Sequence, residues 1–395
     1  MASTANPGIR LLSAPALGDD SVQSLLISLL RGLAAIQVAA AHLRAEFFPG
    51  LRTMADPPLA YQGLAFFTGF AHQAVVLFFL ISGWLVGGSL MGKMGRSQAL
   101  PAYAIDRLTR LWTVLIPTFM LMLLFGMVAG ELIPNTIDYS RSNNYSVLSF
   151  IGNLVGLQTV TMAQFGGNYP LWSLANETWY YLMFPLLLVL LTESTPARRT
   201  LAMLALLAIA LALPYAMTLY FLIWLLGAAF SRVRVECGNA ARWALLALFA
   251  AVSVYFRLTG SNDALTSASF VQDLVYSIVF LLFLASMHMK VDPASRPLAR
   301  LGVAAKFFAE FSFTLYVFHV PLIRVMQHIG LKLWGGYRLS PANWIDYGVY
   351  FSLLAAILVL SYGSYLLFEA HTPKVRRWLK ELLLSPARVP ASVKR

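Results

Sequence analysis

Charged residues are scarce in this chain of 395 residues. They make up 12% of the sequence, whereas a soluble globular domain carries about a quarter. Hydrophobic residues make up 59%, and this leaves too little polar surface to cover the apolar side chains in water. The composition therefore excludes an ordinary soluble protein and predicts an integral membrane protein.

Cysteine is also nearly absent. The single Cys237 excludes an intramolecular disulfide. No local cluster of His and Cys has the spacing of metal ligands, so we expect no bound metal. The sequence lacks a P-loop, a Gly-x-Ser-x-Gly elbow, a dinucleotide-binding fingerprint and a His-Glu-x-x-His motif. The sequence therefore gives no indication of the common nucleotide-binding, serine-hydrolase or zinc-metalloprotease sites that these motifs mark.

Apolar runs fill most of the chain. About 20 apolar residues in a helix span a bilayer, and about ten such runs predict an all-α, polytopic integral membrane protein. The fifth and sixth runs are short, and only Pro214 divides them. The predicted spans are 22–43, 70–91, 108–130, 172–192, 198–213, 216–231, 241–257, 270–288, 305–330 and 345–370.

The spans define one membrane domain, residues 21–380, between a polar cytoplasmic tail, 1–20, and a basic cytoplasmic tail, 381–395. Residues 1–20 have no basic region and no small-residue cleavage site, so the first span is expected to act as its own insertion signal. No internal repeat is visible, which disfavours a transporter built from repeated halves.

The net charge of +12 indicates membrane lipids rather than nucleic acid as the partner. If both termini are cytoplasmic, the tails and cytoplasmic loops hold 21 of the 29 Lys and Arg residues. The outer loops hold six, and two lie within spans. Because cytoplasmic loops are enriched in Lys and Arg, this distribution predicts N-in, C-in and an even number of spans.

The first span carries two ionisable residues. Arg31 and His42 are eleven residues apart, which places them on one helix face, roughly 16 Å apart along the axis. A charge this deep in a bilayer usually faces a cavity or the bundle interior. The alternative is an interfacial His42 and an Arg31 that reaches toward the headgroups.

Glu177 lies near the start of the fourth span, and we place it near the outer face with His42. A carboxylate there could orient the imidazole for general-base catalysis. The alternative is an acid that faces the helix dipole within an interfacial belt that includes Trp172.

Arg107 and Arg110 lie on one face at the cytoplasmic end of the third span. Arginine side chains suit phosphate oxygens, so they could bind a phosphorylated cytosolic ligand. The alternative is that they only fix the membrane orientation.

Polar residues also mark two other spans. Ser312, Tyr316 and His319 form one stripe in the ninth span, where Pro321 is expected to kink the helix and free a carbonyl. The stripe could instead be a hydrogen-bond seam between helices. Ser82 precedes a glycine near the middle of the second span, a pattern that more often serves close packing. Three histidines have no matching partner and receive no role: His72, His288 and His328.

These segments together resemble the membrane-bound acyltransferase 3 family, from about Leu25 to Lys380. LLRGLAAIQVAAAHL is similar to its Arg/Lys-x10-His motif, FFLISGWLVG to its Phe-Phe-x-x-Ser-Gly helix, and RLTR to its Arg-x-x-Arg element. WSLANETWYYLMFPLLL and SFTLYVFHVPLI resemble its Trp-Ser-Leu-x-x-Glu signature and its ninth helix. Two departures are Ser28 at a position that is often Asp, and Pro373 displaced from Glu369.

The resemblance implies transfer of an acyl group, with acetyl as the expected one, from cytosolic acyl-CoA to a hydroxyl of an extracytoplasmic carbohydrate or glycolipid. It implies a location in the bacterial cytoplasmic membrane. His42, Arg31 and Glu177 would be catalytic, and Arg107, Arg110 and Arg31 would bind acyl-CoA. The residues expected along the substrate channel are Ser82, Trp172, Ser173, Ser312, Tyr316 and His319.

His42 would take the proton from the acceptor hydroxyl, since an unperturbed histidine pKa of about 6.5 leaves a neutral base at physiological pH. Arg31 could stabilise the oxyanion. A route through an acylated residue stays open. The alternative function is a transporter or flippase for a glycolipid or anionic solute, with Arg31 and Glu177 as its substrate pair.

Overall fold

The structure is a computed structural model, and it describes residues 8–13, 17–18, 20–129, 144–260, 265–292 and 295–384. Most of the predicted N-terminal tail and of the predicted tail 381–395 lies outside the described residues. Arg141, one of the six basic residues counted in the predicted outer loops, also lies outside them.

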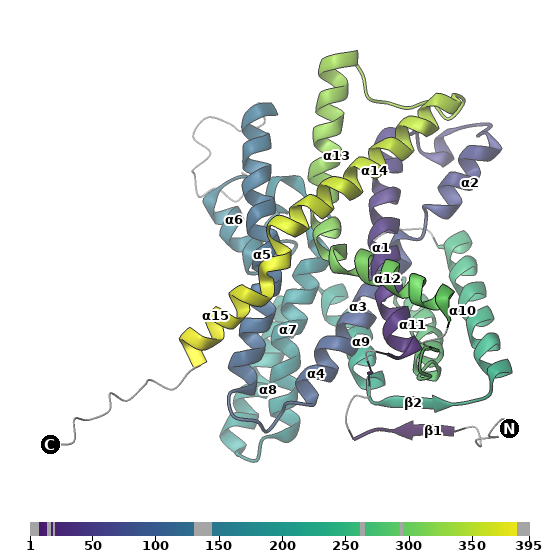
Figure 1. Cartoon of the computed structure of the whole chain (residues 1–395). Coiled ribbons are helices and arrows are strands. Elements are labelled where there is room, and N and C mark those ends of the chain that lie inside the picture. The colour runs from purple at the N-terminus through teal and green to yellow at the C-terminus, as the bar shows by residue number, and fades with distance from the viewer. Residues whose placement is uncertain are drawn as a thin grey trace.

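Helices form nearly the whole described chain (Figure 1). The first half contains α1 (Val22–Phe47), α2 (Leu59–Phe67), α3 (Ala71–Ser82), α4 (Gly88–Met91), α5 (Ala99–Ala129), α6 (Val147–Leu154) and α7 (Leu171–Thr192). The second half contains α8 (Pro196–Ala212), α9 (Tyr215–Phe230), α10 (Asn239–Thr259), α11 (Phe270–Ser286), α12 (Arg296–Glu310), α13 (Ser312–Trp334), α14 (Trp344–Leu367) and α15 (Thr372–Leu384). A single π-helical turn, Gly83–Gly87, joins α3 to α4.

Membrane-compatible helices dominate this fold. Within the described ranges, six helical stretches are long and apolar enough to cross a bilayer, or seven if the bent pair α12 and α13 forms one span. The shorter α9 and α11 are also apolar. The ten predicted spans fall on helical segments, the second and the ninth on more than one helix, and the all-α, polytopic prediction is confirmed. The number of crossings and their orientation stay predictions.

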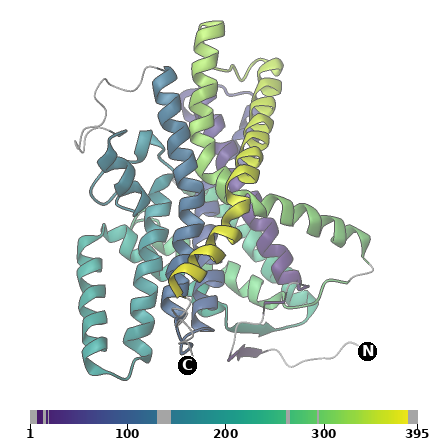
Figure 2. The same cartoon turned by 60° about the vertical axis from the view of Figure 1, so that its left-hand side comes forward.

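The predicted ninth span, 305–330, covers parts of two helices, and its main bend is not at the predicted Pro321. The chain bends by 54° between α12 and α13, at Phe311, whose backbone leaves the helical region and whose side chain is buried. Figure 2 shows α12 projecting sideways from α13. Lys306 therefore lies on the amphipathic α12 and not at the start of an apolar span.

Pro321 acts as the sequence predicts in one respect. It frees the carbonyl of Val317, which accepts a hydrogen bond of 2.9 Å from Asn168 Nδ2. The helix α13 nevertheless runs through Pro321, so the marked bend lies ten residues earlier, at Phe311.

Two short strands constrain the membrane topology. β1 (Gly8–Leu11) pairs antiparallel with β2 (Val233–Glu236), and Arg10 forms an ion pair of 3.2 Å with Glu236. Backbone hydrogen bonds require both strands to lie on the same side of the membrane. The chain between them must therefore cross the membrane an even number of times, which agrees with the six spans predicted there.

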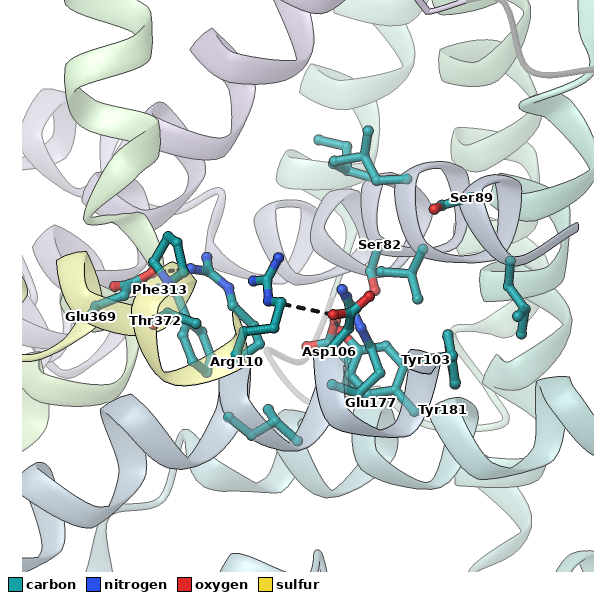
Figure 3. A pocket seen from close by; sticks show the side chains of 18 of the residues that line it. Ser82, Ser89, Tyr103, Asp106, Arg110, Glu177, Tyr181, Phe313, Glu369 and Thr372 are labelled. Atoms are coloured by element: carbon teal, nitrogen blue, oxygen red, sulfur yellow. Dashed lines mark hydrogen bonds and ion pairs between the residues drawn. The ribbon is translucent and has the colours of Figure 1, made fainter. Parts of the chain in front are cut away.

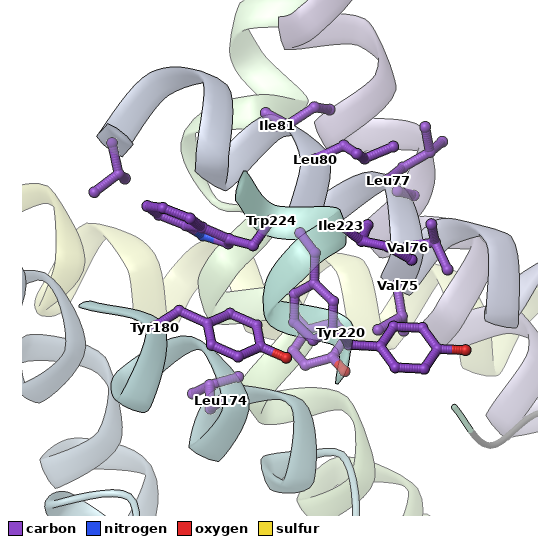
Figure 4. Packing of buried hydrophobic residues seen from close by; sticks show 14 of the residues in the cluster. Val75, Val76, Leu77, Leu80, Ile81, Leu174, Tyr180, Tyr220, Ile223 and Trp224 are labelled. Atoms are coloured by element: carbon purple, nitrogen blue, oxygen red, sulfur yellow. The ribbon is translucent and has the colours of Figure 1, made fainter. Parts of the chain in front are cut away.

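The core divides into two hydrophobic clusters. The larger joins α3, α5, α7, α9 and α11, and Figure 4 shows its packing around Trp224 and Tyr220. The smaller joins α1, α13 and α14. Two glycines let the backbone of α9 approach its neighbours. A Cβ at Gly83 in the π turn would lie 2.0 Å from the Trp224 carbonyl oxygen of α9, and a Cβ at Gly227 of α9 would lie 2.2 Å from the Leu80 carbonyl oxygen of α3.

Candidate active site

A cavity of about 870 Å³ is lined by residues of α1, α3, α4, α5, α7, α12, α13 and α15 and of the connection between α4 and α5. In Figure 1, α4 lies at the same end of the molecule as the β1–β2 pair. Figure 3 shows the cavity from close by. Its wall includes both charged and apolar side chains, so it suits a ligand with an anionic part and an extended apolar part. The predicted site residues that line it are Arg31, Ser82, Arg107, Arg110, Ser173, Glu177, Ser312 and Tyr316.

Glu177 is the centre of a hydrogen-bond network in the cavity wall. Ser82 Oγ donates to Glu177 Oε1 at 2.5 Å, and the Tyr181 hydroxyl donates to the same oxygen. Trp224 Nε1 in turn donates to Ser82 Oγ at 3.1 Å. Ser82, at the end of α3, therefore has a polar partner in addition to its place beside the close helix contact at Gly83.

The predicted contact between Glu177 and His42 is not present among the described hydrogen bonds. α7 begins at Leu171, and Tyr169, just before it, packs edge-on against His42 with ring centroids 4.9 Å apart. Six residues of helix then carry Glu177 about 9 Å away along the axis, to the level of Ser82. Glu177 also lies beyond the first turn of α7, so the alternative role at the helix dipole does not apply.

Arg31 faces the cavity from α1. Its side chain is half-buried, and Nη2 lies 3.5 Å from Ser312 Oγ at the edge of hydrogen-bond distance. The guanidinium is thus directed into the bundle and not along α1 toward the headgroups. A cation in this position can attract an anionic group that enters the cavity.

The two arginines of α5, Arg107 and Arg110, differ in whether an acidic side chain already pairs with them. Arg110 forms an ion pair with the buried Glu369, whose Oε2 also accepts a hydrogen bond from Thr314 Oγ1 at 2.5 Å. Arg107 lies over the ring of Tyr181 at 5.5 Å, and its buried Nε has no hydrogen-bond partner in the described structure. Arg107 is therefore better placed than Arg110 to bind an added anion.

Sequence reasoning missed several cations at the cavity. Lys93, Arg96 and Lys306 line it and are exposed, and none makes an ion pair with a described residue. Arg376 and Lys380 also line it, at 3.5 and 2.6 Å from Asp106 Oδ1. The only sequence signal for these residues was their membership of the basic cytoplasmic segments, which does not reveal that they converge.

His42 and His319 form a pair beyond the inner end of the cavity. His42 Nδ1 lies 2.8 Å from His319 Nε2, and His319 Nδ1 lies 3.1 Å from the Leu315 carbonyl oxygen. A carbonyl only accepts hydrogen bonds, so His319 Nδ1 carries a proton and His319 Nε2 is left as an acceptor. His42 Nδ1 must then donate to it, and the lone pair of His42 lies on Nε2.

Tyr316 and Ser173 separate this pair from the cavity. Their hydroxyl groups are 2.7 Å apart, and the ring of Tyr316 lies 6.1 Å from that of His319. Both line the cavity, whereas His42 and His319 do not. Trp172 is half-buried against the larger core cluster and is not among the lining side chains.

The family model for an acyltransferase domain matches residues 26–366. The chain belongs to the acyltransferase 3 family. The resemblance in the sequence motifs is thereby confirmed, and the chain is a multi-pass membrane acyltransferase. Neither a curated protein nor a solved structure matches the chain.

α1 and α13 share a third polar contact, farther from the cavity than the histidine pair. Gln327 Nε2 donates to Glu46 Oε2 at 3.1 Å. Glu46 is one helical turn beyond His42, and Gln327 is two turns beyond His319. Polar groups therefore continue from the histidine pair along the same helix interface, away from the cavity.

A second hydrogen-bonded pair, between His72 and Asp273, lies away from the acyltransferase cavity. The prediction that His72 has no matching partner is therefore wrong. His72 Nε2 is 2.7 Å from Asp273 Oδ1, and the Tyr220 hydroxyl donates to the other oxygen of Asp273. His72 and Asp273 are both buried. The group joins α3, α9 and α11. No group of three or more His, Cys, Asp or Glu side chains in the described ranges could hold a metal ion.

Proposed function

We propose that this acyltransferase moves an acyl group, with acetyl as the expected one, from cytosolic acyl-CoA to a hydroxyl of an extracytoplasmic carbohydrate or glycoconjugate. The observation that carries the proposal is the fixed lone pair on His42 Nε2, one layer of side chains beyond a cation-lined cavity. We assign the protein to the cytoplasmic membrane of a bacterium, with the cavity open to the cytosol.

The donor would enter by the cavity. Its phosphates would bind at the mouth, where Lys93, Arg96 and Lys306 have no ion-pair partner in the described chain. Arg107, whose Nε is unsatisfied, would contribute a further donor. The pantetheine arm would follow the wall past Arg31 and Ser82 toward Tyr316. Arg110 would support this surface indirectly, because Glu369 already neutralises its charge.

Transfer would take place at the histidine pair. His42 Nε2 takes the proton of the acceptor hydroxyl while the hydroxyl oxygen attacks the thioester carbonyl carbon. The carbon–sulfur bond then breaks, and the CoA thiolate receives the proton from the His42 imidazolium. His319 keeps His42 in the required tautomer, a role that the sequence assigned to Glu177. The reaction requires Tyr316 and Ser173 to part so that the thioester reaches His42.

The acceptor would approach from the outer side. Glu46 and Gln327 provide a carboxylate and an amide there, and these groups bind hydroxyls well. Membership of an acyltransferase family favours this function over the alternative of a transporter or flippase, for which the described geometry offers no additional support.

The test uses inside-out membrane vesicles supplied with acetyl-labelled CoA. We expect label in carbohydrate inside the vesicles with the natural sequence, and none above background with His42→Ala. His328→Ala is the matched control. It removes a different histidine, on α13, that is expected to lie toward the same outer face of the membrane as His42. Transfer that survives His42→Ala would refute the proposal, and movement of a glycolipid without CoA release would support the transporter.

A further inference from the structure

The last helix, α15, has an apolar face that no described part of the chain covers. Val375, Trp378 and Leu382 are spaced as neighbours on one side of the helix. Trp378 and Leu382 are 60% and 63% exposed. The charged residues of the helix are mostly basic, four Lys and Arg residues against the single Glu381. Exposed Trp and Leu beside a basic face are typical of a helix that lies in a membrane interface.

The position of α15 fits this composition. It follows the apolar α14 after only Phe368 and one tight turn, Glu369–His371. Those four residues span at most about 14 Å, so α15 begins near the cytosolic end of a membrane helix. Figure 1 and Figure 2 show it crossing α5 obliquely.

We propose that α15 docks on the anionic lipid surface of the cytosolic leaflet. Val375, Trp378 and Leu382 enter the boundary between headgroups and acyl chains, and Lys374 and Arg377 bind lipid phosphates. Lys374 and Arg377 are exposed and make no ion pair with a described residue. A second copy of α15 is a poorer occupant of this face, because two helices with an excess of three positive charges repel each other.

Docking of α15 on lipid would also fix the position of one wall of the cavity. Arg376 and Lys380, on another side of α15, contact Asp106 of α5 and line the cavity wall. The helix that binds the lipid surface is thus the same helix that forms one side of the mouth. The inference concerns a surface outside the proposed catalytic pair, and its test does not depend on acyl transfer.

The experiment exploits the single cysteine. In a Cys237→Ser background, Leu382→Cys receives a nitroxide label, and Glu381→Cys provides a matched site on the polar face of the same helix. The protein is placed in nanodiscs of phosphatidylcholine alone or mixed with anionic phosphatidylglycerol. Collisions of each label with oxygen, which dissolves in lipid, and with a water-soluble nickel complex report its depth.

We expect the label at 382 to be shielded from nickel and accessible to oxygen, more so with phosphatidylglycerol, and the label at 381 to remain in water. Each Lys or Arg near an anionic surface contributes about 1 kcal/mol. Lys374→Gln with Arg377→Gln should therefore lower the ratio of docked to undocked helix about 30-fold. Equal exposure of both labels to nickel in both lipids would overturn the proposal, as would dipolar broadening that shows pairing with a second copy.

Discussion

Two hydrogen-bonded pairs that contain histidine join distant helices of this acyltransferase. One joins two histidines and the other joins a histidine to an aspartate, and the two pairs differ in how deeply they are buried. His42 and His319 are 2.8 Å apart, and His42 Nε2 has no partner among the described residues. His72 and Asp273 are 2.7 Å apart and both buried. The carboxylate of Asp273 is further held by Tyr220. The pair that contains a carboxylate, His72–Asp273, is therefore the more deeply buried of the two.

The difference shows that a carboxylate beside a histidine is not sufficient evidence for a catalytic base. The His72–Asp273 pair is hydrogen-bonded inside the core and, with Tyr220, joins α3, α9 and α11, so we expect it to be a structural contact. Each pair leaves one ring nitrogen without a hydrogen-bond partner among the described residues, His42 Nε2 and His72 Nδ1, but His72 Nδ1 is buried whereas His42 is only half-buried. Access to the unpartnered nitrogen distinguishes a reactive pair from a structural one.

The largest expected effect comes from His42→Ala. Loss of a general base lowers the turnover number by about 10²- to 10⁴-fold, whereas the thermal midpoint should hardly change because His42 is only half-buried. Turnover is measured as CoA release per folded molecule in proteoliposomes, and the midpoint by a thermal shift in detergent. A fall in the midpoint with unchanged turnover would reverse the roles assigned to the two pairs.

Asp273→Ala should have the opposite profile. Removing one partner of a buried hydrogen bond costs about 1 to 3 kcal/mol for each polar group left unsatisfied, and here both His72 and Tyr220 lose their shared acceptor. We expect a clear drop in the thermal midpoint and a near-normal turnover number in the molecules that remain folded. A loss of turnover in well-folded protein would instead place Asp273 in the chemistry.

The smallest expected effect is the difference in turnover number between two variants of His319. It tests whether His319 positions His42. His319→Gln can still place an oxygen near His42 Nδ1, whereas His319→Leu cannot accept a hydrogen bond. We expect His319→Gln to retain about ten times the turnover number of His319→Leu, since one lost hydrogen bond is worth about 1 kcal/mol or somewhat more. Similar thermal midpoints in the two variants are the control. Equal turnover would show that His319 only fills space.

The sequence predicted the components of the fold and site better than their pairing. Helix periodicity alone placed Arg31 and His42 on one face, and Ser312, Tyr316 and His319 on one stripe, because these relations lie within single helices. The carboxylates of Glu177, Asp273 and Glu369 pair with residues 95, 201 and 259 positions away. Such partners depend on how helices pack, and no local pattern encodes them.

The bend at Phe311 escaped sequence reasoning for a related reason. Residues 305–330 contain enough apolar side chains for one span, and Pro321 is the obvious site for a kink. The break occurs instead where the Phe311 side chain is buried among the helices α1, α13 and α14. Its position is therefore determined by tertiary packing and not by local helix preference.

The pairing of β1 with β2 also imposes an order on assembly during synthesis. Residues 8–11 leave the ribosome first, but their partners at 233–236 emerge about 220 residues later. At about 5 to 20 residues per second, that is a delay of roughly 10 to 45 s. All the membrane helices from α1 to α9 are made in that interval, so the N-terminal strand pairs only after they have been synthesised. The N-terminus thus remains unpaired through the first half of biogenesis, when it is open to other partners.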